Sequence, residues 1–226
     1  MTHLLPEYIE AETGTAPQYC VIWLHGLGAD GNDFASLPPQ LGVSPELAVR
    51  YVFPHAPVIP VTINMGTPMP AWYDITSLDA RGQDEAGIRQ SAALIEMLIA
   101  REIDRGVPAS RIVLAGFSQG AAMALFTGLR YESPLAGLLV LSGYLPLHER
   151  LPKEAAESNQ QVPILQAHGR HDDVVPRQLG YGSAELLRAA GYQVEWHEYE
   201  MAHEVCFEEV QEIGRWLNRV FGEESD

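Results

Sequence analysis

One serine in this chain stands where the sequence pattern could turn a hydroxyl into a nucleophile. The stretch "RIVLAGFSQGAAMAL" (111–125) places Ser118 between Gly116 and Gly120, after an apolar run and before an alanine-rich one. A strand that passes into a helix through Gly-x-Ser-x-Gly predicts a very sharp turn with the serine at its apex. Glycine is needed on both sides because the two backbones pass close together. The turn exposes the hydroxyl.

A serine hydroxyl needs a general base beside it to attack a carbonyl at neutral pH. The only lysine, Lys153, lies in the polar stretch "LPKEAAESNQQ", which argues against a serine–lysine pair. Among the histidines, His203 in "YEMAHEVCFEEV" follows the last expected strand and precedes the last expected helix. This position is at the carboxyl edge of the expected sheet, where Ser118 must also lie. His203 is therefore the predicted base.

A carboxylate should orient the base, and "VPILQAHGRHDDVVP" supplies Asp172 and Asp173 shortly after another expected strand. The chain order of serine, aspartate and histidine is that of an α/β-hydrolase triad. In such a triad Ser118 attacks a carbonyl, and His203 takes the proton and later returns it to the leaving group. The aspartate orients the imidazole and stabilises its charged form.

The same stretch contains His168 and His171, which could instead suggest a metal site. Gly169 interrupts any helix that would align the two rings, and no second cluster of ligands accompanies them. We expect neither a metal nor another cofactor.

Two backbone amides are candidates to stabilise the oxyanion that forms during such an attack. The amide of Gln119 lies at the start of the expected helix, where free N–H groups and the helix dipole favour negative charge. The loop "HGLG" (25–28) follows an early strand, and its glycines let the backbone turn the Leu27 amide toward the serine. Taken alone, "HGLG" is better explained as an ordinary glycine-rich turn, and it is the elbow that makes the Leu27 amide a candidate donor alongside Gln119.

These residues are positioned by short apolar runs that alternate with segments of helical period, a pattern typical of a mostly parallel sheet covered by helices. The expected strands are 19–24, 50–53, 111–116, 137–143, 162–168 and 193–199, and the expected helices are 84–105, 118–130, 178–190 and 204–220. The least regular part is 54–83, and a connection of this length is more often functional than idle. We expect one domain over residues 1–226.

The composition limits the classes of partner. Thirty acidic and 14 basic residues give a formal net charge of -16, which repels nucleic acid and anionic lipid headgroups. The first basic residue is Arg50, so no secretory signal is visible, and no apolar run is long enough to span a bilayer. We expect a cytoplasmic protein without stable membrane insertion. A disulfide between Cys20 and Cys206 is not expected in a domain of this size.

Seven blocks of the sequence also resemble, in order, the carboxylesterase and acyl-protein thioesterase group of α/β-hydrolases, sometimes described as phospholipase/carboxylesterase. The blocks are "LHGLGADG" (24–31), "PVTINMGTPMPAWYDI" (60–75), "DEAGIRQSA" (84–92), "RIVLAGFSQGAAMAL" (111–125), "LSGYLP" (141–146), "HGRHDDVVP" (168–176) and "MAHEV" (201–205). They run through nearly the whole chain, which makes the resemblance far more specific than the serine motif alone.

The resemblance implies an α/β-hydrolase fold with a central, mostly parallel sheet, helices on both faces and no large lid domain. It places the nucleophile at Ser118 and the base at His203. It places the acid at Asp172, so that Asp173 is a neighbouring turn carboxylate. The implied substrates are small esters, lysophospholipids or acylated proteins.

The resemblance also implies oxyanion-hole amides at Leu27 and Gln119. "MPAWYDI" is similar to the stretch that borders the acyl pocket, which implies a substrate-binding role for Trp72; packing in the core is the alternative. Members of the family are often dimers, so a homodimer is an expectation that rests on the resemblance only.

Two functional hypotheses follow. The favoured one is a metal-independent serine hydrolase that cleaves carboxylic esters or thioesters through an acyl-enzyme. The alternative is a non-catalytic protein of the same fold that binds a small apolar ligand, since a fold does not fix a function. Such a binder would have no need to keep nucleophile, base, acid and both oxyanion loops together.

Overall fold

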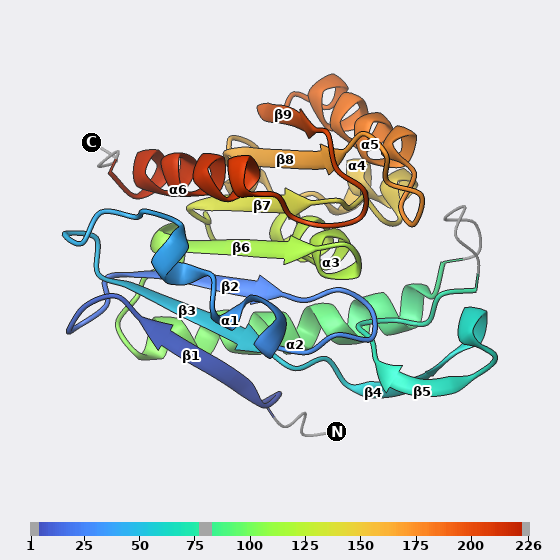
Figure 1. Cartoon of the computed structure of the whole chain (residues 1–226), viewed down its shortest axis with the longest axis horizontal. Coiled ribbons are helices and arrows are strands. Elements are labelled where there is room, and N and C mark those ends of the chain that lie inside the picture. The colour runs from blue at the N-terminus through green and yellow to red at the C-terminus, as the bar shows by residue number, and fades with distance from the viewer. Residues whose placement is uncertain (1–4, 77–82, 223–226) are drawn as a thin grey trace.

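The centre of the structure is a seven-stranded sheet with the strand order β1-β3-β2-β6-β7-β8-β9 (Figure 1). The computed structural model describes residues 5–76 and 83–222. The strands are β1 (Tyr8–Glu12), β2 (Tyr19–Leu24), β3 (Val49–Pro54), β6 (Ile112–Phe117), β7 (Gly137–Leu141), β8 (Ile164–Gly169) and β9 (Val194–Tyr199). β1 pairs with β3 in antiparallel orientation, and every other neighbouring pair is parallel. The carboxyl ends of β2, β6, β7, β8 and β9 therefore meet at one edge.

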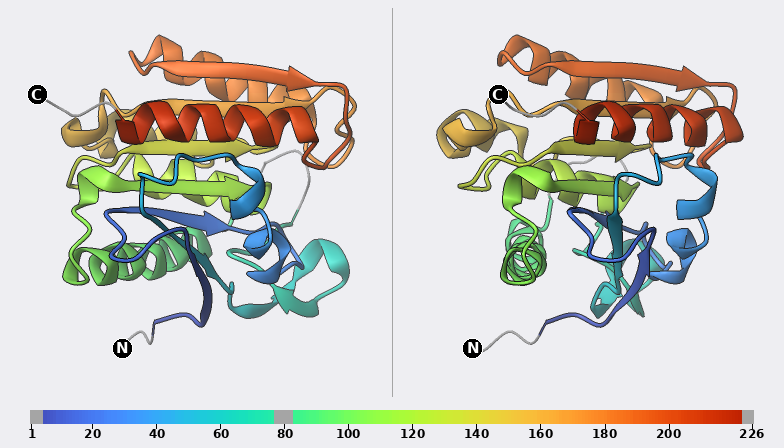
Figure 2. Two further views of the ribbon diagram at one scale, coloured as in Figure 1. Left: turned by 60° about the vertical axis from the view of Figure 1, so that its left-hand side comes forward. Right: turned by 90° about the vertical axis from the view of Figure 1, so that its left-hand side faces the viewer.

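Helices cover both faces of this sheet, as expected from the sequence (Figure 2). The α-helices are α1 (Asn32–Ala35), α2 (Glu85–Asp104), α3 (Gln119–Gly128), α4 (Leu151–Glu154), α5 (Arg177–Ala189) and α6 (Phe207–Gly222). Short 3-10 helices span Pro38–Gln40, Thr62–Asn64, Ala109–Arg111, His148–Arg150 and Glu157–Asn159. Side chains of α2, α3 and α5 pack on one face, and those of α1 and α6 pack on the other.

The central strands are apolar almost throughout because both of their faces are covered. On β2, Ile22 and Leu24 belong to the core under α2 and α3, whereas Val21 and Trp23 belong to the core under α6. Both clusters of buried apolar side chains extend along the sheet, and this packed layer fixes where the strand ends lie. The two cysteines, Cys20 and Cys206, are free.

Three strands were not predicted. β1 lies at the sheet edge and is only half-buried, so its sequence "YIEAE" lacks the apolar run of a central strand. The expectation that 54–83 is irregular was wrong in part, because β4 (Val58–Val61) and β5 (Thr67–Pro70) form an antiparallel hairpin there. Proline removes a ladder donor and normally signals a loop, but it is tolerated in a two-stranded ribbon, where each strand is an edge.

Helix α6 begins three residues later than expected, at Phe207 instead of Glu204, which leaves His203 in a longer loop. The third residue of α6, Glu209, is 1% exposed, and neither of its carboxylate oxygens has a hydrogen-bond partner among the described residues. Burial raises the pKa of Glu209 to about 8, and the nearby amide of Cys206 offsets this only in part. The carboxyl is therefore protonated in the folded protein at neutral pH.

The buried Glu209 predicts a pH-dependent stability. Its ordinary pKa is 4.5, so the unfolded chain loses this proton first, and the folded state loses stability as the pH rises from about 4.5 to about 8. Glu209→Gln removes this loss. Relative to wild type, the free energy of unfolding of the variant should rise by on the order of 3 kcal/mol as the pH increases from 5 to 8. Urea unfolding at several pH values measures the difference. Glu208→Gln, at an exposed position in the same turn, is the control. If the free energies of unfolding of wild type and Glu209→Gln changed with pH in parallel, the prediction would be wrong.

Candidate active site

Ser118 occupies a strained turn between β6 and α3. Its backbone has φ 55° and ψ −118°, a conformation that residues other than glycine rarely adopt. The Ser118 amide donates to the Leu141 carbonyl of β7 at 2.8 Å, and the Ser118 carbonyl accepts from the Ala122 amide of α3 at 3.1 Å. Because strand and helix hold it from both sides, the strained backbone cannot relax. The predicted elbow is present.

The glycines on both sides of the serine are required by close backbone contacts. A Cβ on Gly116 would lie 2.3 Å from the Gly120 carbonyl group. A Cβ on Gly120 would lie 2.2 Å from the carbonyl oxygen of Leu24 at the end of β2. No real Cβ atom tolerates such distances from backbone, so glycine at both positions lets β2, β6 and α3 meet at the elbow.

The predicted acid and base lie together in the turns after β8 and β9. His203 Nδ1 donates to Asp172 Oδ2 at 2.7 Å. The two turns are joined by their backbones, since the Arg170 amide donates to the Tyr199 carbonyl at 2.9 Å and the His171 amide to the Met201 carbonyl at 3.1 Å. The parallel pairing of β8 with β9 thus continues past the strand ends and brings the acid to the base.

The Asp172 carboxylate is buried but well supplied with donors. Oδ1 accepts from the amides of Val174 at 3.0 Å and Val175 at 2.8 Å. Burial alone would raise the pKa of Asp172, but hydrogen bonds from His168 and His203 outweigh it and hold the pKa well below its usual range. The carboxylate is therefore ionised wherever the protein is folded at neutral pH. Its neighbour Asp173 is exposed.

The imidazole of His203 lies beside the elbow. Its ring centroid is 4.7 Å from that of Phe117, the residue that precedes Ser118, and the two rings are tilted by 42°. The His203 side chain is 15% exposed. Nδ1 is occupied by Asp172, so Nε2 is the nitrogen that the predicted triad would use as the base. The structure thus brings three sequence-predicted residues, Ser118, Asp172 and His203, to one edge of the sheet.

The "HGLG" loop packs directly on Ser118. A Cβ on Gly26 would lie 3.3 Å from the Ser118 Cβ. The Gly28 amide donates to the Pro70 carbonyl of β5 at 2.8 Å, so the hairpin supports this loop. The amides of Leu27 and Gln119 have no acceptor among the described residues, and Gln119 is the first residue of α3. Free amides beside the serine are what an oxyanion hole needs.

His25 holds this loop in place, a role that the sequence analysis did not assign. It is 1% exposed; its Nδ1 donates to the Gly26 carbonyl at 2.7 Å, and its Nε2 accepts from the Ala56 amide at 3.0 Å. Burial lowers the pKa of His25, and the bond to Gly26 offsets this only in part. The neutral ring thus fixes the loop through two hydrogen bonds. The sequence signal for this role is a histidine at the end of an apolar strand, directly before a glycine-rich loop.

The side chain of Gln119 was also missed, because the sequence drew attention only to its amide. Gln119 Oε1 accepts from the Trp72 amide at 2.8 Å, and its Nε2 donates to the Tyr73 carbonyl at 2.8 Å. Trp72 in turn donates its indole N–H to the His25 carbonyl at 2.9 Å. Trp72 is 1% exposed, which favours the packing alternative, and contact with a substrate stays a prediction. These bonds connect segment 71–73 to the "HGLG" loop and to the first residue of α3.

The two histidines considered for a metal have separate partners. His168 is buried and contacts Asp172, whereas His171 is exposed and bonds the Glu200 carboxylate at 2.9 Å. Among residues 5–76 and 83–222, no group of three or more histidine, cysteine or acidic side chains could hold a metal ion.

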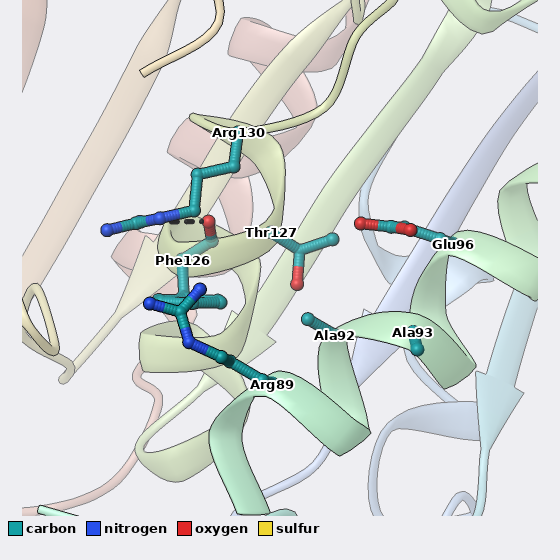
Figure 3. Close-up of a pocket in the computed structure, with 7 residues that line it drawn as sticks. All are labelled: Arg89, Ala92, Ala93, Glu96, Phe126, Thr127 and Arg130. Carbon is teal, nitrogen blue, oxygen red and sulfur yellow. Dashed lines mark hydrogen bonds between the residues drawn. The ribbon is translucent and has the colours of Figure 1, made fainter. Parts of the chain in front are cut away.

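A pocket of about 240 Å³ lies between α2 and α3 (Figure 3). It is lined by Arg89, Ala92, Ala93, Glu96, Phe126, Thr127 and Arg130. Thr127 lies near the carboxyl end of α3 and Arg130 lies two residues beyond that end, while Ser118 precedes the first residue of the helix. With a rise of about 1.5 Å per residue, this separates the pocket from the serine by roughly 13 Å. The pocket is distinct from the candidate active site.

No helix within the described part of the chain is both long enough and apolar enough to cross a membrane.

The sequence and the fold are similar to those of known hydrolases. A sequence model of the phospholipase/carboxylesterase family matches residues 7–221. Acyl-protein thioesterase 1 of Neurospora crassa is 45% identical over 209 residues, which cover 87% of this chain and 84% of the relative. Acyl-protein thioesterase 1 of Mycosarcoma maydis is 36% identical over 228 residues, which cover 94% and 95%.

Solved structures give the same result. SOBER1 of Arabidopsis thaliana matches with a TM-score of 0.84 at 30% identity, over 89% of this chain and 98% of that protein. Acyl-protein thioesterase 2 of Zea mays matches with a TM-score of 0.84 at 29% identity, over 96% and 100%. The α/β-hydrolase fold expected from the sequence is confirmed, and the residues described contain no large lid. This chain belongs to the phospholipase/carboxylesterase family of α/β-hydrolases and is a hydrolase.

Proposed function

We propose that this hydrolase cleaves carboxylic esters and thioesters through a covalent acyl-enzyme formed on Ser118. The observation that carries the proposal is the 2.7 Å hydrogen bond between His203 Nδ1 and Asp172 Oδ2, with the imidazole packed beside the strained serine. An ionised carboxylate, a histidine and an elbow serine in this order form an acyl-transfer site.

In the first half of the reaction, Ser118 Oγ attacks the carbonyl carbon while His203 Nε2 takes the hydroxyl proton. The carbonyl oxygen becomes an oxyanion, which accepts hydrogen bonds from the Leu27 and Gln119 amides. The tetrahedral species collapses, the carbon–oxygen or carbon–sulfur bond breaks, and His203 gives its proton to the departing alcohol or thiol. Asp172 stabilises the imidazolium throughout. Water, activated by the same imidazole, then releases the acid and restores the serine.

The names of the relatives support a substrate class. The proteins of Neurospora crassa and Mycosarcoma maydis that match most of this chain are named acyl-protein thioesterases, which supports S-acylated proteins as substrates. Small esters and lysophospholipids present the same carbonyl to the site. The net charge of -16 opposes tight docking on anionic membranes. A cytoplasmic location and a homodimer stay predictions, and light scattering tests the latter.

The alternative of a non-catalytic binder leaves two features without a use. A binder needs neither an ionised, buried Asp172 bonded to an imidazole nor a strained backbone at Ser118. A strained backbone lowers the stability of the fold, so its presence at Ser118 favours a role for this serine in chemistry.

Replacement of the nucleophile tests the proposal directly. Ser118→Ala should lower kcat/KM for a chromogenic short-chain ester by on the order of 10⁴ or more, because only oxyanion stabilisation and substrate binding remain. A fluorophosphonate should label wild type and not the variant, as seen by mass spectrometry of the peptide that contains position 118. Wild-type protein that neither turns over esters nor takes up the label would support the binder.

The two adjacent aspartates provide a matched pair. Asp172→Asn should lower kcat by up to about 10⁴, because the amide cannot hold His203 in the required tautomer and charge state. Asp173→Asn, at an exposed position, should change the barrier by no more than about 0.5 kcal/mol. Steady-state kinetics on the same ester decide between them, and the opposite ranking would mean that Asp173 is the acid.

A series of matched esters and thioesters with acyl chains of increasing length addresses the substrate class. If S-acylated proteins are the substrates, kcat/KM for thioesters should rise with chain length, since each buried CH₂ contributes about 0.8 kcal/mol or about fourfold. A preference for the shortest esters, with thioesters untouched, would restrict the enzyme to small-molecule esters.

A further inference from the structure

The second histidine at the active site, His168, has no role in the mechanism above. It lies on β8 just before the turn that carries the acid, and its side chain is completely buried. Its Nε2 is 2.9 Å from the Val175 carbonyl oxygen and 3.3 Å from Asp172 Oδ2. The same carboxylate oxygen therefore faces two imidazoles, that of His203 at 2.7 Å and that of His168.

The partners of His168 fix the position of its proton. A backbone carbonyl and a carboxylate both accept, so Nε2 carries the hydrogen and donates to them. Nδ1 is buried without a partner among the described residues, and the space beside it is closed by Gly180 of α5, where a Cβ would lie 2.4 Å from Nδ1. A second proton there would have no acceptor. The neutral Nε2–H form satisfies this environment, and the ring contributes a donor without adding a charge.

His168 also connects both ends of the acid turn. It stands before the turn, and it binds the Val175 carbonyl at the far end of the turn as well as the Asp172 carboxylate. The ring is held in turn by Trp196 of β9, whose ring centroid lies 6.0 Å away at an interplanar angle of 25°. With the Val174 and Val175 amides on Oδ1, the carboxylate has donors on both oxygens besides His203.

We propose that His168 is a positioning residue: its buried Nε2–H fixes the orientation of the Asp172 carboxylate, and through it the imidazole of His203. The proposal rests on the triad proposed above. Without His168, Oδ2 would keep His203 as its single donor, and only the two amides on Oδ1 would oppose rotation of the carboxylate about its terminal bond. A displacement of about 1 Å in a catalytic group lowers the rate by about 100-fold. The loss should appear in kcat, since His168 is fully buried and touches no substrate.

Two variants at position 168 test the role of the donor. His168→Leu removes it and should lower kcat by about 100-fold with KM changed by less than about twofold. His168→Gln places an amide N–H near the position of Nε2, and its kcat should be at least about tenfold higher than that of the Leu variant. Rates are divided by the concentration of sites titrated with a fluorophosphonate, so that a lower folded fraction does not count as a lower kcat. The deshielded Nδ1 proton of His203 in NMR spectra should persist in the Gln variant and shift in the Leu variant.

A second pair leaves every hydrogen-bonding group in place. Gly180→Ala pushes a methyl group against the His168 ring and should lower kcat, whereas Gly182→Ala, in the same helix with nothing within 4 Å of its Cβ, should not. If His168→Leu does not fold, this pair decides. Equal kcat values for the Leu and Gln variants, or for the two glycine variants, would overturn the proposal. Failure of the triad itself would appear separately, as absent turnover in wild type.

Discussion

The close approach of three backbone segments at the elbow is the constraint on which the site depends. β2, β6 and α3 meet where Gly116 and Gly120 leave no room for a Cβ, and Ser118 is held there in a strained conformation with a positive φ. This contact places the serine at the end of β6, directly before the first residue of α3. The strain is tolerated because the apolar layers on both faces of the sheet keep β6 and α3 in place.

The remaining parts of the site are fixed to this elbow through buried polar groups. Gln119 and Trp72 connect it to the "HGLG" loop, and His25 fixes that loop from inside as a neutral ring. On the other side, the pairing of β8 and β9 carries Asp172 to His203. Gln119, Trp72 and His25 each have defined hydrogen-bond partners, which fix this side of the site before a substrate arrives. Such preorganisation is the main way in which protein dipoles stabilise a developing oxyanion.

Most of the fold could be predicted because its central strands and long helices have strong local signals. β2, β6 and β8 are short apolar runs, and α2 has apolar residues at helical spacing. Three edge strands were missed, since exposure on one side removes the apolar run and proline in β5 resembles a loop signal. The start of α6 was misplaced by three residues because its first turn is as polar as the loop before it. Residues 77–82 of the irregular segment lie outside the described residues.

The sequence by itself determined the candidate nucleophile, base and acid, because each stands at a strand end in the order of a known triad. Only the tertiary structure decided how they are held. The bonds of His25 and the Gln119 side chain, the second imidazole at Asp172 and the burial of Trp72 all join residues far apart in the chain. Local patterns report which face of an element is buried. They carry no information about which polar groups meet across elements, since those contacts arise only when the packed layers fix the strand ends in space.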